Sequence, residues 1–123
     1  MAHVNGIGGF FFESEDPALL GRWYAEHLGI SPPPQSYDEP VWEQAAGPTV
    51  FAPFAREQGE SSPVGAHGWG INLRVDDLDA IVDELRRAGI EVTGDPERYP
   101  IGRFAQLSDP EGNAVQLWEP SER

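Results

Sequence analysis

The last strand pair of the chain constrains its fold most strongly. Residues 103–108 and 113–118 alternate apolar and polar side chains, and the turn DPEG lies between them at residues 109–112. Proline presets φ for the first corner of a turn, glycine accepts positive φ, and aspartate can bond the backbone ahead of it. This pattern predicts a β-hairpin over residues 102–120.

The two faces of the last strand differ in character. Successive side chains of a strand point to opposite faces, so Val115 and Leu117 share one face, while Ala114, Gln116 and Trp118 share the other. We expect the apolar face to pack against helices. An amide beside an indole predicts a wall that faces a ligand on the other side, although a tryptophan at a strand end also packs without binding.

The first half of the chain reads as a strand, a helix and two short strands. Residues 6–13 predict the first strand. Asp16, followed by proline, predicts the N-cap of a helix over residues 17–28. Residues 40–44 and 49–52 predict two short strands around an Ala-Ala-Gly turn.

The same order of elements then returns. Residues 69–75 predict a strand, Asp77 caps a helix predicted over residues 78–88, and residues 90–94 predict another strand before the closing hairpin. The apolar stripe of this second helix recurs at helical spacing. The second half therefore predicts its own β-α-β-β-β unit.

A sequence repeat relates the two halves. Gly9 corresponds to Gly70 and Asp16 to Asp77, each 61 residues later. The chain is thus predicted to be α+β, with two tandem β-α-β-β-β modules that form a curved mixed sheet with a central cleft. Alternating helices and strands also occur in doubly wound parallel sheets, but the closing hairpin and the short strand pairs argue against that alternative.

One domain over residues 1–123 accounts for the length of the chain. The first module is predicted at about residues 6–54 and the second at about residues 67–119. A linker loop joins them at about residues 55–66, where glycine, serine, proline and charged residues gather.

Composition excludes several classes of protein. An apolar content of 39% with 11% aromatic residues is typical of a folded soluble protein. The net charge of −13 argues against nucleic acid and against anionic membrane surfaces, and no apolar run approaches the ~20 residues that span a membrane. The absence of cysteine excludes disulfides and thiolate chemistry, and fits the cytoplasmic location that we expect.

The hairpin resembles a family motif. Its form G-x-x-A-x-x-x-D-P-x-G-N-x-V-x-L is similar to the closing hairpin of the vicinal oxygen chelate superfamily. This superfamily includes glyoxalases, bleomycin-resistance proteins, extradiol dioxygenases and metal-free glyoxalase-like proteins. Together with the internal repeat, the resemblance covers nearly the whole chain and implies the same paired-module fold.

The metal site of the enzymes in this superfamily does not carry over. Its four cleft-facing ligand positions correspond to Gly9, Phe51, Gly70 and Gln116. Three of these residues cannot bind a metal, and a lone amide is a weak ligand for a divalent ion. The three histidines lie at other positions. The resemblance is therefore to the metal-free branch, with no cofactor, and disfavours metal-dependent glyoxalase or dioxygenase activity.

The predicted cleft face combines aromatic side chains with a few polar ones, which is typical of a small-molecule pocket. The candidate ligand-binding residues are Phe11, Glu13, Trp42, Phe51, Asn72, Arg74, Phe104, Gln106, Gln116 and Trp118. Glu13 and Arg74 form either a mechanistic pair or a salt bridge, and the salt bridge is favoured. The sequence contains no Ser-His-Asp order, phosphate loop or paired-histidine motif, so no catalytic residue is nominated.

Three functions remain open. The favoured one is a metal-independent protein that sequesters or carries an aromatic or cationic small molecule, as bleomycin-resistance proteins do. The alternative is a glyoxalase-like lyase or isomerase, or a dioxygenase-related enzyme, acting on a small metabolite; an accessory domain with an unused cleft is the third. We also predict a homodimer, because curved half-barrels leave sheet edges and an open cleft. Whether the cleft closes within one chain or between two stays open.

Overall fold

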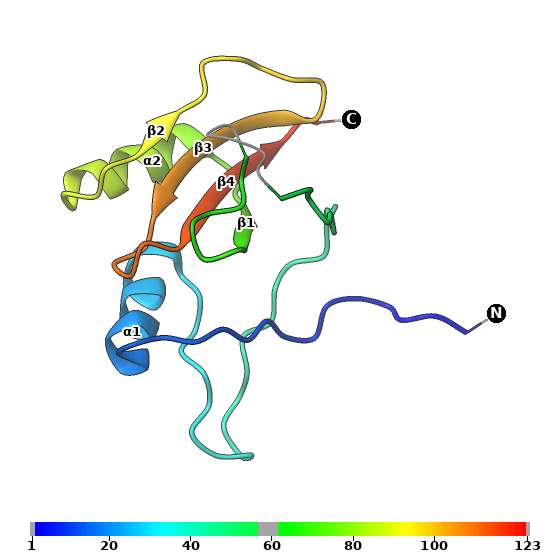
Figure 1. Cartoon of the computed structure of the whole chain (residues 1–123), viewed down its shortest axis with the longest axis vertical. Coiled ribbons are helices and arrows are strands. Elements are labelled where there is room, and N and C mark those ends of the chain that lie inside the picture. The colour runs from blue at the N-terminus through cyan, green and yellow to red at the C-terminus, as the bar shows by residue number, and fades with distance from the viewer. Residues whose placement is uncertain (1, 57–61, 123) are drawn as a thin grey trace.

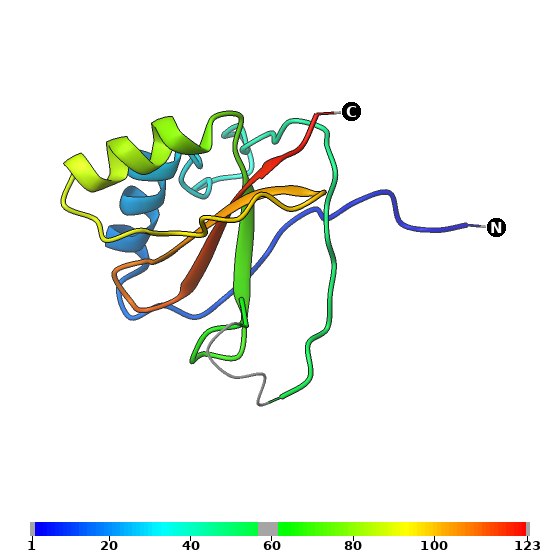
Figure 2. The same ribbon diagram turned by 90° about the horizontal axis from the view of Figure 1, so that it is seen from above.

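A computed structural model describes residues 2–56 and 62–122, so part of the predicted linker, residues 57–61, lies outside the described residues. Both helices lie on one side of a single sheet (Figure 1, Figure 2). None of the helices in the described part is long and apolar enough to cross a membrane. The elements in chain order are α1 (Pro17–Leu28), β1 (Gly70–Arg74), α2 (Leu78–Arg87), β2 (Thr93–Gly94), β3 (Gly102–Ser108) and β4 (Ala114–Pro120).

The sheet is mixed, with strand order β1-β4-β3-β2. β1 runs parallel to β4, whereas β3 pairs antiparallel with both β4 and β2. The α+β class and the mixed sheet predicted from the sequence are therefore confirmed. Of the strand predicted over residues 90–94, only Thr93 and Gly94 pair in the sheet.

The predicted hairpin is formed by β3 and β4, which pair from Gly102 opposite Pro120 to Ser108 opposite Ala114. In the turn, the backbone N–H of Gly112 donates to the carbonyl of Asp109 at 2.9 Å. Gly112 has a φ of 81°, which an L side chain adopts only under strain. The turn chemistry of the sequence thus determines this connection.

Both helices begin where the sequence predicts. The Asp16 carboxylate accepts the Leu19 N–H at 3.1 Å, and the Asp77 carboxylate accepts the Ala80 N–H at 3.0 Å. α1 has the predicted bounds, and α2 ends at Arg87, one residue earlier than predicted.

The core lies between the two helices and the sheet. Val115 and Leu117 are fully buried on the helix-facing side of β4. They belong to one apolar cluster with residues of both helices and of β3, including Leu20, Tyr24, Leu78, Leu85, Ala105 and Leu107. The predicted apolar face of the last strand is confirmed, and Gln116 must then point to the opposite face.

A buried carboxylate ties α1 to the hairpin turn. Asp109 is 4% exposed, and its Oδ2 accepts hydrogen bonds from the Tyr24 hydroxyl and the Asn113 amide, both at 2.7 Å. Its Oδ1 accepts the backbone N–H groups of Glu111 and Asn113. Burial, together with this carboxylate, raises the pKa of Tyr24. The turn therefore does more than reverse the chain: it positions a helix.

The neighbouring Glu111 holds the chain just before α1. Its carboxylate accepts the Ser14 hydroxyl at 2.7 Å and the backbone N–H groups of Glu15 and Asp16 at 3.0 and 3.2 Å. These bonds lower the pKa of Glu111, with the Ser14 bond the largest cause. Beyond this anchor the N-terminal segment runs away from α1 (Figure 1).

The strands predicted in the first half are not formed. Residues 6–13, 40–44 and 49–52 contain neither helix nor strand in the structure. A strand requires a neighbour that satisfies its backbone N–H and C=O groups, and these segments pair with no strand in the described chain. In the described chain only the second module builds a sheet, and α1 of the first module packs against that sheet.

Candidate functional site

Six of the predicted ligand-binding residues share the sheet face opposite the helices. Strand alternation, together with the burial of Val115 and Leu117 on the helix side, assigns them to this face. The residues are Asn72 and Arg74 on β1, Phe104 and Gln106 on β3, and Gln116 and Trp118 on β4. The strand register arranges them in two rows.

The first row consists of three amides. Gln116 lies opposite both Asn72 and Gln106 in the register. The Asn72 amide nitrogen donates to the Gln116 side-chain oxygen at 2.7 Å. This bond uses one donor and one acceptor, so the pair keeps the Asn72 oxygen as an acceptor and the Gln116 nitrogen as a donor.

The second row contains the guanidinium of Arg74 and the aromatic rings of Trp118 and Phe104. Trp118 lies opposite both Arg74 and Phe104. The rings of Phe104 and Trp118 are nearly parallel, with centroids 6.1 Å apart and an interplanar angle of 8°. The indole N–H donates to the Ile101 carbonyl at 2.9 Å, which fixes the orientation of this buried ring.

Arg74 is bound by backbone and not by a carboxylate. Its Nη2 donates to the carbonyl of Ala45 at 2.9 Å. The prediction of a salt bridge between Glu13 and Arg74 is wrong, since no ion pair joins these two residues in the structure. The segment that holds Ala45 runs on the side of the sheet away from the helices (Figure 2).

The four candidates from the first half lie in segments without helix or strand, and all four are exposed in the described chain. Phe11 and Phe51 are 94% and 85% exposed, Trp42 is 44% exposed, and Glu13 is exposed. Within residues 2–56 and 62–122, no hydrogen bond, ion pair or ring contact joins any of them to the six residues on the sheet. Their segments lack the strands that would fix their direction.

The sequence reasoning missed an aromatic cluster beside β1. The rings of Phe10 and Phe12 lie 5.0 and 4.7 Å from the Trp69 ring, between centroids, and 5.7 Å from each other. The sequence carried a signal for it, because Phe10 and Phe12 share one face of the strand predicted over residues 6–13 and Trp69 opens the strand predicted over residues 69–75. This cluster brings the N-terminal segment alongside the start of β1.

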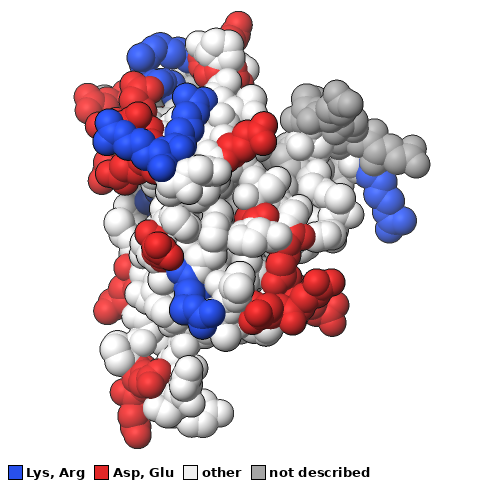
Figure 3. Space-filling view, turned by 90° about the vertical axis from the view of Figure 1, so that its left-hand side faces the viewer, with Lys and Arg blue, Asp and Glu red and all other residues white. Residues whose placement is uncertain are grey.

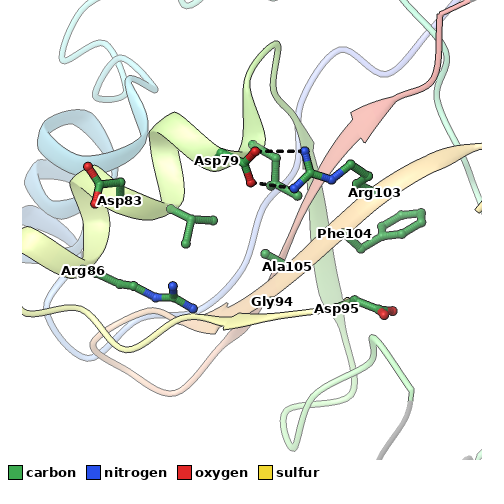
Figure 4. Close-up of a pocket in the computed structure, with 10 residues that line it drawn as sticks. Asp79, Asp83, Arg86, Gly94, Asp95, Arg103, Phe104 and Ala105 are labelled. Atoms are coloured by element: carbon green, nitrogen blue, oxygen red, sulfur yellow. Dashed lines mark hydrogen bonds and ion pairs between the residues drawn. The ribbon is translucent and has the colours of Figure 1, made fainter. Parts of the chain in front are cut away.

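A hollow of about 290 Å³ lies elsewhere, between α2 and the β2–β3 edge (Figure 4). Its two arginines have polar partners: Arg103 forms an ion pair with Asp79, and Arg86 donates to the Val92 carbonyl at 2.9 Å. The ion pair raises the pKa of Arg103 and lowers that of Asp79. Because amide and aromatic side chains converge on the opposite sheet face, we place the candidate site there.

The described residues contain no group of three or more histidine, cysteine, aspartate or glutamate side chains that could hold a metal ion. At two of the positions carried over from metal-dependent relatives, the structure opposes a ligand. An added Cβ at Gly70 would overlap the Pro63 carbonyl oxygen, and the Gln116 oxygen already accepts from Asn72. The donor set therefore does not fit a resident metal of that type.

The side of the molecule that carries the helices presents side chains of both charges. Figure 3 shows acidic side chains in several groups over this face, with arginine side chains among them. The sequence contains no lysine and no cysteine, which removes the amine and thiol nucleophiles used in covalent catalysis.

Comparisons with known proteins are consistent with this architecture. The family model of the Glyoxalase/Bleomycin resistance protein/Dioxygenase superfamily matches residues 14–117. Anthracycline biosynthesis protein DauV from Streptomyces sp. (strain C5) is 29% identical over 125 residues, which cover 96% of this chain and 44% of DauV. Putative glyoxylase CFP32 from Mycobacterium bovis is 39% identical over 54 residues, which cover 43% of this chain and 21% of CFP32. The chain thus spans less than half the length of these curated relatives.

A solved structure matches over nearly the whole chain. The crystal structure of TnmS3, described as an antibiotic binding protein from Streptomyces sp. CB03234, is 25% identical in sequence and superposes with a TM-score of 0.61. The match covers 98% of this chain and 100% of TnmS3.

Proposed function

This chain belongs to the Glyoxalase/Bleomycin resistance protein/Dioxygenase superfamily, and from that premise we propose that it is a metal-independent protein that binds a small aromatic molecule. The observation that carries the proposal is the two registered rows of amide, aromatic and guanidinium side chains on one sheet face. Convergent polar groups beside aromatic rings are the usual lining of a small-molecule site. The match to TnmS3, described as an antibiotic binding protein, supports the same function.

An aromatic ligand fits this face better than a cationic one. Among the six residues, Arg74 carries the charge, and a guanidinium repels a cation. Glu13, which could have attracted a cation, forms no ion pair with a described residue. The half-buried Phe104 ring, which stacks on Trp118, offers an aromatic surface for a planar partner.

An enzyme is the second candidate, and the match of DauV, named as an anthracycline biosynthesis protein, to 96% of this chain favours it. Catalysis would require a group that moves protons or forms a covalent bond. The six face residues offer amides, rings and one guanidinium, none of which is a general base near neutral pH. Binding is therefore the preferred function.

The proposed functional unit is a homodimer located in the cytoplasm. Support for the dimer comes from large apolar side chains of the first half that are exposed in the single chain. They include Ile7, Phe10, Phe11, Val41, Trp42, Val50, Phe51 and Phe54, which are 44–94% exposed. A second copy would cover such a surface. Light scattering at micromolar concentration should give twice the 13.5 kDa chain mass, and a monomer would contradict the proposal.

Titration with anthraquinone-2-carboxamide tests the binding function. We expect saturable quenching of tryptophan fluorescence, and chromatography with mass detection should return the compound unchanged. Conversion of the compound would support the enzyme. Absence of saturable binding to this compound and to its charged analogues would refute the proposed function.

A further inference from the structure

Two of the described arginines are half-buried, and their surroundings differ. Arg103 lies against the carboxylates of Asp79 and Glu119. Arg74, in contrast, has no ion pair within residues 2–56 and 62–122, although the chain carries 21 acidic residues against 8 basic ones. The other described arginines are exposed. A partly desolvated guanidinium without a counter-charge therefore lies on the candidate ligand face.

Among the described residues, one carbonyl accepts a hydrogen bond from Arg74. A guanidinium has five N–H donors in a planar fork, and the Ala45 carbonyl accepts from one nitrogen. Partial burial of a charge costs free energy unless a partner compensates. A planar pair of oxygens would engage the fork in two parallel bonds, which are stronger than a bond to a neutral carbonyl.

The loop that supplies Ala45 approaches the guanidinium very closely. A Cβ added at Gly47 would overlap the Nη1 atom of Arg74. The overlapping atom is the far end of a flexible side chain, so the contact can give way without moving the sheet.

We propose that Arg74 is the specificity-determining residue of the site, and that it selects planar aromatic ligands that carry a carboxylate. The ligand oxygen replaces the Ala45 carbonyl on the guanidinium, and the aromatic body extends along the row toward Phe104. This inference rests on the proposed binding function and adds the charge of the ligand to it.

Three anthraquinones with the same rings test the inference: the 2-carboxylate, the neutral 2-carboxamide and the cationic 2-aminomethyl compound. Tryptophan fluorescence titrations at pH 7 should show the carboxylate binding at least about tenfold more tightly than the carboxamide, with the aminomethyl compound weakest. A tenfold ratio corresponds to about 1.4 kcal/mol.

Two variants of Arg74 test whether this residue causes the preference for the carboxylate. Arg74→Gln should reduce carboxylate affinity about tenfold or more and leave carboxamide affinity within about threefold. Arg74→Lys, which keeps the charge but loses the fork, should retain part of the preference. Arg22→Gln removes the same charge from an exposed position on α1 and should change no affinity.

The titrations distinguish a failure of the charge preference from a failure of the proposed binding function. If wild type binds the carboxamide as tightly as the carboxylate, or if Arg74→Gln keeps the preference, the inference is wrong and the binding function stands. If none of the three compounds binds, both are wrong. Thermal melting monitors the folding of each variant, and the ranking of the compounds by wild type decides the matter even if Arg74→Gln is unstable.

Discussion

The two halves of the molecule follow one sequence pattern and build different structures. The second half forms a complete sheet with its own helix, whereas the first half forms α1 and leaves its strand-like segments unpaired. α1 contributes Leu20 and Tyr24 to the core of the second half. Alternation of apolar and polar residues thus makes a segment able to form a strand, but the strand forms only where a neighbouring strand can pair with it.

The turns explain part of this difference. If Gly47 is placed on Gly112, Gln44 stands where the second half has Asp109. The Asp109 carboxylate accepts two backbone N–H groups of its own turn, and Asn113 adds a side-chain bond to it. No such side-chain to backbone bonds involve Gln44 in the described structure. The second turn therefore closes its hairpin locally, and the first turn does not.

Truncation of a core residue should show the largest difference in stability between the two halves. We expect Leu117→Ala to lower the free energy of unfolding by about 2–5 kcal/mol, because Leu117 is fully buried beneath the helices. Phe51→Ala, at an 85% exposed position of the first half, should change it by no more than about 0.5 kcal/mol. Urea unfolding measures both. Equal losses would mean that the first half is packed in the assembled protein.

Removal of the buried carboxylate should have the next largest effect. Asp109→Ala leaves the Tyr24 hydroxyl and the Asn113 amide without their acceptor, at about 1–3 kcal/mol for each unsatisfied group. Asp83→Asn, which breaks an exposed ion pair with Arg87, should cost less than about 0.5 kcal/mol. Thermal melting of the two variants compares them, and a similar Tm would contradict the anchoring role of the second-half turn.

Two substitutions at neighbouring positions test whether the two faces of β4 have different roles in binding and folding. Gln116→Ala should weaken binding of the anthraquinone carboxylate by about 0.5–1.5 kcal/mol and barely alter folding, since its side chain leaves no core cavity. Val115→Ala should do the reverse, because Val115 is fully buried on the helix side. Melting temperature and affinity are measured for both. The opposite outcome would mean that ligand approaches from the helix side.

The smallest expected effect is a pH dependence at the link between the halves. Ser14 and the backbone around it hold the pKa of Glu111 below its ordinary value of 4.5. A depressed carboxyl pKa stabilises the fold above the unfolded-state pKa, and this contribution is lost as the pH falls through the folded-state pKa. Glu111→Gln should therefore be less stable than wild type at pH 7, and the gap should shrink toward pH 3.

Denaturant unfolding at both pH values measures this gap. Glu26→Gln removes the same charge from an exposed position of α1 and should show no comparable pH dependence. A gap between wild type and Glu111→Gln that persists at low pH would contradict the assignment.

Local signals predicted the parts of the fold that depend on few residues. Asp16 and Gly29 delimit α1 because capping acts within a turn of the helix. The hairpin and the direction of Gln116 also followed, since alternation and turn chemistry act over a short stretch of chain. The six face residues of the second half were grouped correctly for that reason.

The rest depends on contacts between distant residues. Arg74 meets Ala45 through a loop that no periodicity describes, and Asn72 meets Gln116 because β1 lies beside β4. The salt bridge expected between Glu13 and Arg74 was wrong because it assumed a strand that has no neighbour in the chain. Side-chain partners across such distances require the topology first.

The hydrogen bonds from the hairpin turn to α1 and to the chain before it have a consequence for the order of folding. They join residues 85 to 97 positions apart, whereas the hairpin itself closes over a short loop. Closing a long loop costs more chain entropy and contributes to slow folding. We therefore expect α1 to dock after the turn has formed, so that refolding buries Tyr24 in a later phase than the one in which β3 pairs with β4.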